Sequence, residues 1–157
     1  MINNFEMEIG DRVLAFEHGR VANQAAGSIT IQYGDTMLLA TAAASKTPRP
    51  GADFLPLTVD VAEKSYAAGK LPGGFFKREG RPATEAILAS RMIDRPIRPL
   101  FSKTIHNEIQ IIVTILASDN VNPYPALGIV GASTALAISD IAFNDPIGAC
   151  VIGLVEG

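Results

Sequence analysis

Apolar and polar residues alternate along much of the first sixty positions, a pattern typical of β-strands that have one face against a core. Glycine and aspartate interrupt the alternation at Gly10-Asp11 and again at Gly34-Asp35, as expected for tight hairpin turns. The chain therefore begins with a β-rich half. The strands predicted there cover residues 5–9, 12–18, 27–33, 36–42 and 57–61.

The pattern changes to a helical period after residue 82. Residues 83–95 are predicted to form a helix, because Pro82 stands just before this segment and Pro96 is expected to stop it. The apolar positions recur three and four residues apart, so one face of this helix is expected to cover the sheet. The residues on or beside that face are Ala86, Leu88, Ala89, Met92 and Ile93.

Three further elements complete the predicted fold. Residues 108–117 form a run rich in Ile and Val, which predicts a strand covered on both faces. Residues 125–139 are small and apolar and predict a buried helix, and residues 147–155 predict a last strand. This order indicates an α+β (mixed α/β) fold with a curved mixed sheet packed against helices. Because no element follows the last strand, we expect a domain truncated at its C-terminal side.

The loop at residues 71–82 keeps two aromatic residues next to cations, although glycine-rich loops seldom bury large apolar side chains. Phe75 and Phe76 follow a glycine pair and precede Lys77 and Arg78, with Arg81 nearby. Phenyl rings can stack on bases while cations neutralise phosphates, which is how proteins bind single-stranded nucleic acid. Alternatively, the two rings anchor the loop to the core and the cations form only a solvated surface.

The charges are distributed unevenly, although the formal net charge is only −3. Nine of the 13 basic and three of the 16 acidic residues lie between Lys64 and Lys103, so this window carries +6 and the rest of the chain carries −9. Because charges beyond a Debye length of about 8–10 Å are largely screened, a local positive field is sufficient for binding nucleic acid. The predicted helix adds Arg91 and Arg95 one turn apart and Arg98 just beyond, although such a row often pairs with carboxylates such as Asp94.

Other classes of function find little support in the sequence. No apolar run reaches the ~18 residues of a membrane span, and neither a Walker loop nor a GxGxxG motif is present. Cys150 is the only cysteine, which fits a reducing compartment and a cytoplasmic location; we expect it to be buried in the last strand. His18 and His106 are isolated histidines. Asp53, Asp60 and Glu63 are too isolated along the chain to indicate a metal site.

Long segments of the chain closely resemble the polynucleotide phosphorylase family. They include YAAGKLPGGFFKREGRP at residues 66–82 and IDRPIRPLF at 93–101, with further similarity at residues 53–59, 128–139 and 143–149. The resemblance implies that residues 1–157 form an incomplete first RNase PH-like domain. The family's second RNase PH-like domain, its helical linker and its C-terminal RNA-binding modules are expected to be absent.

The resemblance also implies an activity for the parent protein. Family members are processive 3′-to-5′ exoribonucleases of mRNA degradation that use inorganic phosphate to release nucleoside diphosphates, with Mg²⁺ as cofactor. They form ring-shaped homotrimers around single-stranded RNA and can join the RNA-degradation machinery. We therefore expect this domain to guide RNA and to help build the ring. The alternative is a purely structural or oligomerisation module without direct RNA contact.

The resemblance assigns roles to particular residues. Phe75, Phe76, Lys77 and Arg78 occupy the positions of a loop that grips RNA at the channel mouth, although Lys77 stands where the family usually has arginine. A lysine keeps the charge and loses the planar bidentate fork. Further phosphate contacts are expected at Arg81, Arg91, Arg95 and Arg98.

The catalytic groups and the metal ligands of the family belong to the second domain. At the matching turn, residues 118–125 offer no serine cluster and contain two prolines, which lack an N–H donor. We therefore expect no catalytic and no metal-binding residue in this chain.

Overall fold

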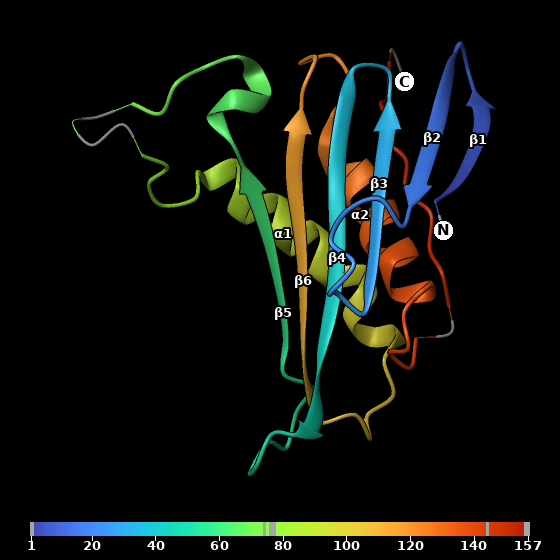
Figure 1. Ribbon diagram of the computed structural model, residues 1–157, viewed down its shortest axis with the longest axis vertical. Helices are drawn as coiled ribbons and strands as arrows, with labels where there is room; N and C mark the ends of the chain where they lie inside the picture. The colour runs from blue at the N-terminus through green and yellow to red at the C-terminus, as the bar shows by residue number, and fades with distance from the viewer. Residues whose placement is uncertain (1, 74, 76–77, 144, 156–157) are drawn as a thin grey trace.

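The computed structural model describes residues 2–73, 75, 78–143 and 145–155. Six strands, two α-helices and two short 3-10 helices follow one another along this part of the chain (Figure 1). The elements are β1 Asn3–Ile9, β2 Arg12–His18, β3 Gly27–Tyr33, β4 Thr36–Pro48, β5 Leu57–Glu63, η1 Ser65–Ala68, α1 Thr84–Ile97, η2 Arg98–Leu100, β6 Asn107–Ala117 and α2 Tyr124–Ala137.

The strands form one mixed sheet in the order β1-β2-β3-β4-β6-β5. All neighbours pair antiparallel except β5 and β6, which are parallel because α1 lies in the connection between them. This confirms the mixed α+β class and the strands predicted in the first half of the chain. The predicted β3–β4 turn is confirmed as well: Gly34 has φ +60°, a left-handed conformation that glycine adopts without steric cost. The fourth strand is longer than predicted, since its pairing with β6 continues to Pro48.

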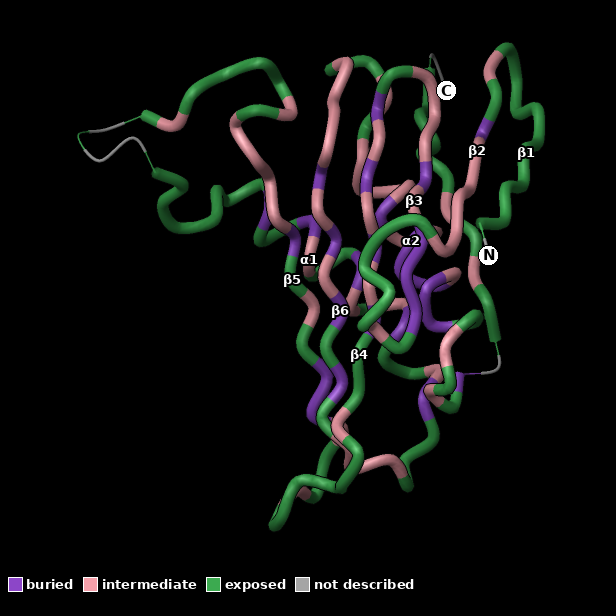
Figure 2. The backbone as a smooth tube through the Cα atoms, viewed as in Figure 1, coloured by how far each residue is buried: buried purple, intermediate pink, exposed green. Residues whose placement is uncertain are grey.

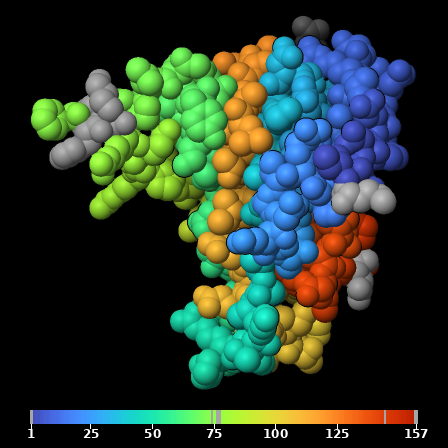
Figure 3. Space-filling model, viewed as in Figure 1, coloured from blue at the N-terminus to red at the C-terminus, as the bar shows by residue number. Residues whose placement is uncertain are grey.

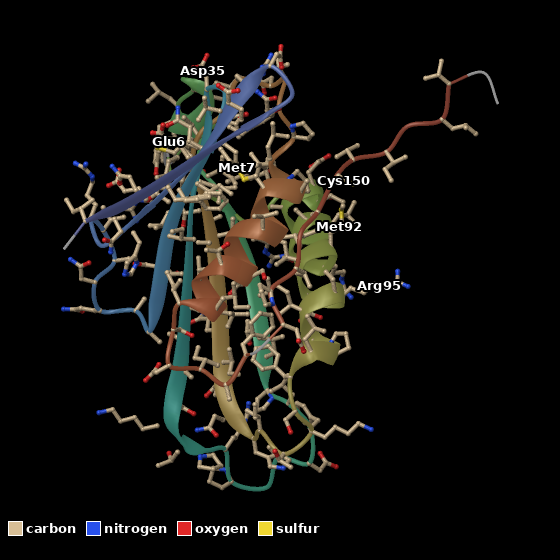
Figure 4. The ribbon with its side chains drawn as sticks, turned by 90° about the vertical axis from the view of Figure 1, so that its right-hand side faces the viewer. Glu6, Met7, Asp35, Met92, Arg95 and Cys150 are labelled. Carbon is tan, nitrogen blue, oxygen red and sulfur yellow. The ribbon has the colours of Figure 1, made fainter. Side chains whose placement is uncertain are left out.

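Both α-helices pack on the same face of the sheet, with α2 over β3 and β4 and α1 over β5 (Figures 1 and 4). The core lies between the helices and this face, and Figure 2 shows the buried residues concentrated there. The prediction that residues 108–117 are covered on both faces is therefore wrong. In β6 the side chains of Ile111 and Val113 are fully buried, whereas Ile112 and Thr114 on the opposite face are only partly covered.

The first helix continues beyond its predicted end. Pro96 lies inside α1, because a proline in the last turn removes only the hydrogen bond to the carbonyl four residues earlier, and the Arg98 N–H still donates to the Asp94 carbonyl. The buried face consists of Ala86, Ala89, Ile93 and Ile97. The expectation that Leu88 and Met92 lie beside this face is wrong, because they are turned by about 100° per residue away from it and more than half exposed.

The predicted strand at residues 147–155 is absent. A strand needs a hydrogen-bonded neighbour, and among the described residues this segment pairs with none of the six strands. It instead runs along the helical layer, where the Ile147 N–H donates to the Ser133 hydroxyl at 2.8 Å, and its described end then leaves the body (Figure 4). Cys150 is consequently exposed, so its predicted burial is wrong.

The two histidines have different environments. The His18 ring nitrogen Nδ1 lies 2.9 Å from the Ser28 carbonyl oxygen, which ties β2 to the start of β3. The Nδ1 atom of His106 is buried without a hydrogen-bond partner in the described part of the chain.

None of the described helices has the length and apolarity that crossing a membrane requires.

Candidate nucleic-acid interface

The described residues of the loop at 71–82 lie at one side of the molecule, beyond β5 (Figures 1 and 3). Phe75 is 92% exposed, so the alternative that this ring anchors the loop in the core is wrong. Phe76 and Lys77, the other two central residues of the predicted RNA grip, lie outside the described residues. Stacking on a base requires a ring that solvent can reach, a condition that a buried ring does not meet.

The returning end of the loop is fixed to the body through Glu79. Its carboxylate accepts hydrogen bonds from the Ser65 N–H at 2.9 Å and from the Ser65 hydroxyl at 3.4 Å. Ser65 begins η1, and η1 is held in turn by the Ser118 N–H, which donates to the Ala67 carbonyl at 3.0 Å. These contacts give the exposed segment a defined base next to the end of β5.

Four of the predicted phosphate-binding arginines are exposed and form no ion pair with any residue that the structure describes. Because their guanidinium groups are not neutralised by protein carboxylates, they keep their charge available for a polyanion. Figure 4 shows Arg95 on the outer side of the helical layer. The four residues are Arg78, Arg81, Arg91 and Arg95.

Arg98 differs from these four because its donors serve the fold. Its Nε and Nη2 atoms donate to both carboxylate oxygens of Asp94, at 2.9 and 2.7 Å. Its guanidinium also donates to the carbonyls of Leu55 and Leu57, at 3.3 and 3.0 Å. The pairing with Asp94 that the sequence suggested as an alternative is confirmed, and Arg98 connects α1 to the start of β5.

An open cavity of about 570 Å³ lies beneath the base of the loop. At its edge the Tyr124 hydroxyl donates a short hydrogen bond to the Glu63 carboxylate. Burial, together with this carboxylate, raises the pKa of Tyr124 well above its usual range, so the phenol stays protonated and acts as a donor. This pair could not be predicted from the sequence, because 61 positions separate Glu63 from Tyr124 and they meet only through the packing of α2 on β6, the strand next to β5.

The turn between β6 and α2 is closed by its own carboxylate. Asp119 Oδ1 accepts the N–H groups of Val121 and Asn122, both at 2.8 Å, and the Thr36 hydroxyl at 2.9 Å. These bonds, chiefly the one from the Asn122 N–H, hold the pKa of Asp119 well below its usual value. Backbone N–H groups just before a helix often bind a phosphate or another anion. Before α2 the N–H groups of Val121 and Asn122 already donate to the Asp119 carboxylate.

Asp119 is expected to make stability depend on pH. Its pKa is lower in the folded than in the unfolded chain, so its contribution is complete above the unfolded value of about 4 and is lost as pH falls toward the folded value. Asp119→Asn should therefore melt at a lower temperature than the unmodified chain at pH 7, and the difference should shrink below about pH 4. Thermal melts followed by circular dichroism at pH 7, 5 and 3 measure this. A difference in melting temperature that stays constant across this range would contradict the assignment.

Metal-ligating side chains do not gather in the described residues, where no group of three or more His, Cys, Asp or Glu could hold an ion.

The chain matches a known class of exoribonuclease domain. The profile of the 3′ exoribonuclease family, domain 1 (RNase PH), matches residues 10–142, and the chain therefore belongs to this family. A chain of the Archaeoglobus fulgidus exosome, solved with RNA bound to the active site, shares the fold with a TM-score of 0.59 and 17% sequence identity. That match covers 88% of this chain and 51% of the exosome chain.

More specific similarity is found to polyribonucleotide nucleotidyltransferases, which the resemblance of the sequence motifs also indicated. The enzyme of Heliobacterium modesticaldum is 56% identical over 153 residues, which is 98% of this chain and 22% of that protein. The enzyme of Roseiflexus sp. strain RS-1 is 58% identical over 156 residues, 99% of this chain and 21% of that protein. The chain thus spans about a fifth of the length of these curated relatives.

Proposed function

We propose that this chain is the RNA-guiding part of a phosphorolytic 3′-to-5′ exoribonuclease that acts in mRNA degradation. The observation that carries the proposal is the exposed Phe75 ring within a window that carries +6. An aromatic surface beside cations binds single strands with little sequence preference, because every base can stack and every nucleotide carries a phosphate. Such binding suits a strand that moves past the site.

The relatives support the reaction. A polyribonucleotide nucleotidyltransferase transfers nucleotidyl groups, and with inorganic phosphate as acceptor it releases nucleoside diphosphates from the end of RNA. We propose the same reaction for the full gene product, in a cytoplasmic homotrimer that associates with the RNA-degradation machinery.

The chemical step is proposed to take place outside these 157 residues. The β6–α2 turn is closed by Asp119, and no metal-ligating cluster lies in the described residues. Mg²⁺ and the attacking phosphate are therefore assigned to another part of the gene product, and no catalytic step is assigned to a side chain of this chain.

A purely structural role is the second candidate, and the β1–β2 hairpin supports it. Every residue of β1 is exposed, and its apolar side chains Phe5 and Met7 are 62% and 43% exposed, which suits a contact with another domain or subunit. This role does not account for the exposed ring and unpaired arginines at the opposite edge of the sheet. We therefore prefer RNA guidance.

An assay of phosphorolysis tests the proposal. The full gene product, incubated with single-stranded RNA, phosphate and Mg²⁺, is expected to release nucleoside diphosphates, whereas residues 1–157 alone are expected to release none. Chromatography of the products measures both reactions. Release of nucleoside diphosphates by residues 1–157 alone would disprove the assignment of the chemistry elsewhere, and release of monophosphates by the full product would disprove phosphorolysis.

A further inference from the structure

The cavity lies beneath the returning end of the loop that carries Phe75. Its wall is formed by the carboxyl end of β5, by η1, by the returning loop and by the start of α2. Its volume of about 570 Å³ is within the range of ligand sites in proteins and is sufficient for a single nucleotide. Its charged lining residues are Asp60, Glu63, Lys64, Glu79 and Arg81.

The charged groups of this cavity differ in how many hydrogen bonds and ion pairs they form with other described residues. Lys64 and Arg81 form no ion pair with any described residue. Glu79 is engaged with Ser65 through both carboxylate oxygens, at 2.9 and 3.4 Å. Glu63 uses only Oε1, for the Tyr124 hydroxyl, and its Oε2 makes no hydrogen bond within the described part of the chain. Two cations, the Oε2 atom of Glu63 and the Asp60 carboxylate thus remain available to a ligand, and of these two carboxylates only that of Glu63 is held in place by a hydrogen bond from the described residues, the one from Tyr124.

This combination fits a ribonucleotide better than a simpler ion. A free phosphate would meet the carboxylates of Asp60, Glu63 and Glu79 as well as the two cations, and like charges disfavour it. A nucleotide within an RNA strand carries two different groups at separate positions. Its phosphate is an anion, and the 2′-hydroxyl of its ribose is a hydrogen-bond donor. The phosphate suits Lys64 and Arg81, and the hydroxyl suits the free oxygen of Glu63.

We propose that the cavity seats one nucleotide of the guided strand and distinguishes RNA from DNA through a hydrogen bond from the ribose 2′-hydroxyl to Glu63. This inference rests on the proposed RNA-guiding function and adds to it a residue that selects the sugar. The 2′-hydroxyl is the group by which proteins tell the two nucleic acids apart at a given site. The Tyr124 hydroxyl is a positioning group, because it fixes the carboxylate by donating to the other oxygen.

The test compares three oligonucleotides of one sequence: single-stranded RNA, the same strand as DNA, and the strand with 2′-O-methyl groups, which cannot donate. Affinities are measured by fluorescence anisotropy on the full gene product without phosphate, so that no turnover occurs. The unmodified protein is expected to prefer RNA to both others by at least about tenfold, which corresponds to about 1.4 kcal/mol and to the weaker end of hydrogen bonds to charged groups. Glu63→Ala should remove this preference while DNA affinity stays unchanged.

Tyr124→Phe is the matched control, because it breaks the same hydrogen bond and keeps the carboxylate in the cavity. It is expected to retain a preference for RNA, whereas a merely structural role of the pair would make both variants lose it equally. Circular dichroism melts establish that both variants fold. Arg81→Ala should weaken RNA and DNA binding alike.

The outcomes separate this inference from the proposed function. If the protein binds RNA and Glu63→Ala leaves the ratio of RNA to DNA affinity unchanged, the assignment of Glu63 is wrong and guidance stands. Equal affinity of the unmodified protein for all three strands also overturns the inference. If neither RNA nor DNA binds at physiological salt, the proposed function itself fails.

Discussion

Replacing Gly27 by alanine is expected to abolish folding of the domain. A Cβ atom at this position would lie 1.9 Å from the backbone carbonyl oxygen of Ala135 and 2.9 Å from Cβ of Ser139. Neither atom can move without shifting the C-terminal end of α2 off β3, which would open the main core. Changes of this kind belong to the few single substitutions that cost more than about 4 kcal/mol. Urea unfolding followed by circular dichroism measures the loss.

Two other glycines provide matched controls for this substitution. Gly148→Ala places its Cβ in open space and should change the free energy of unfolding by less than about 0.5 kcal/mol. Gly131→Ala meets only side chains, at 3.1 to 3.3 Å, and should fall between the two because those side chains can adjust. A Gly27→Ala protein that unfolds at the same urea concentration as the Gly148→Ala protein would show that α2 does not pack on β3 in this way.

Exchange of Phe75, Phe76, Lys77 and Arg78 for alanine in the full gene product is expected to weaken binding of single-stranded RNA by at least about 100-fold. Stacking contributes on the order of 1–3 kcal/mol per base, and two rings are removed. The loss of two cations should also reduce the slope of log affinity against log salt by roughly 1.4, since each phosphate contact to a single strand contributes about 0.7. Anisotropy titrations between 50 and 300 mM salt determine both quantities.

The control for this exchange is Phe54→Ala. Phe54 is 62% exposed, like Phe75 an unburied ring, and it lies outside the basic window. Its removal should leave RNA affinity and salt slope unchanged. If the fourfold variant also binds RNA with unchanged affinity and slope, the loop does not guide RNA, and the structural role of the domain becomes the better explanation.

The strands of the first half could be predicted because the residues that define each strand and turn are close together in the sequence. Alternation at residues 5–9 and 12–18 and a turn at Gly34-Asp35 are sufficient to fix a hairpin, since each depends on neighbours in sequence. The exposed loop was recognised for a similar reason: FFKR next to two glycines is a short, unusual string. Family membership followed from such strings, which require no knowledge of contacts.

The errors arose where the environment of a segment is set by distant parts of the chain. An apolar run such as residues 147–155 becomes a strand only if it pairs with the edge of a sheet, and none of the six described strands pairs with it. Cys150 is exposed for the same reason. The one-sided cover of β6 likewise depends on where α1 and α2 pack, which a run of Ile and Val does not specify.

The sequence by itself determined the strand-rich beginning, the two helices, the basic window and the family, because each of these is written in adjacent residues or in their period. Only the tertiary structure decided which charged groups are free. It paired Arg98 with Asp94 and with the carbonyls of Leu55 and Leu57 at the start of β5, and it left Arg81 without an ion pair to any described residue. It also joined Glu63 to Tyr124 at a cavity, because hydrogen bonding depends on distance in space, and the packing of α2 sets that distance.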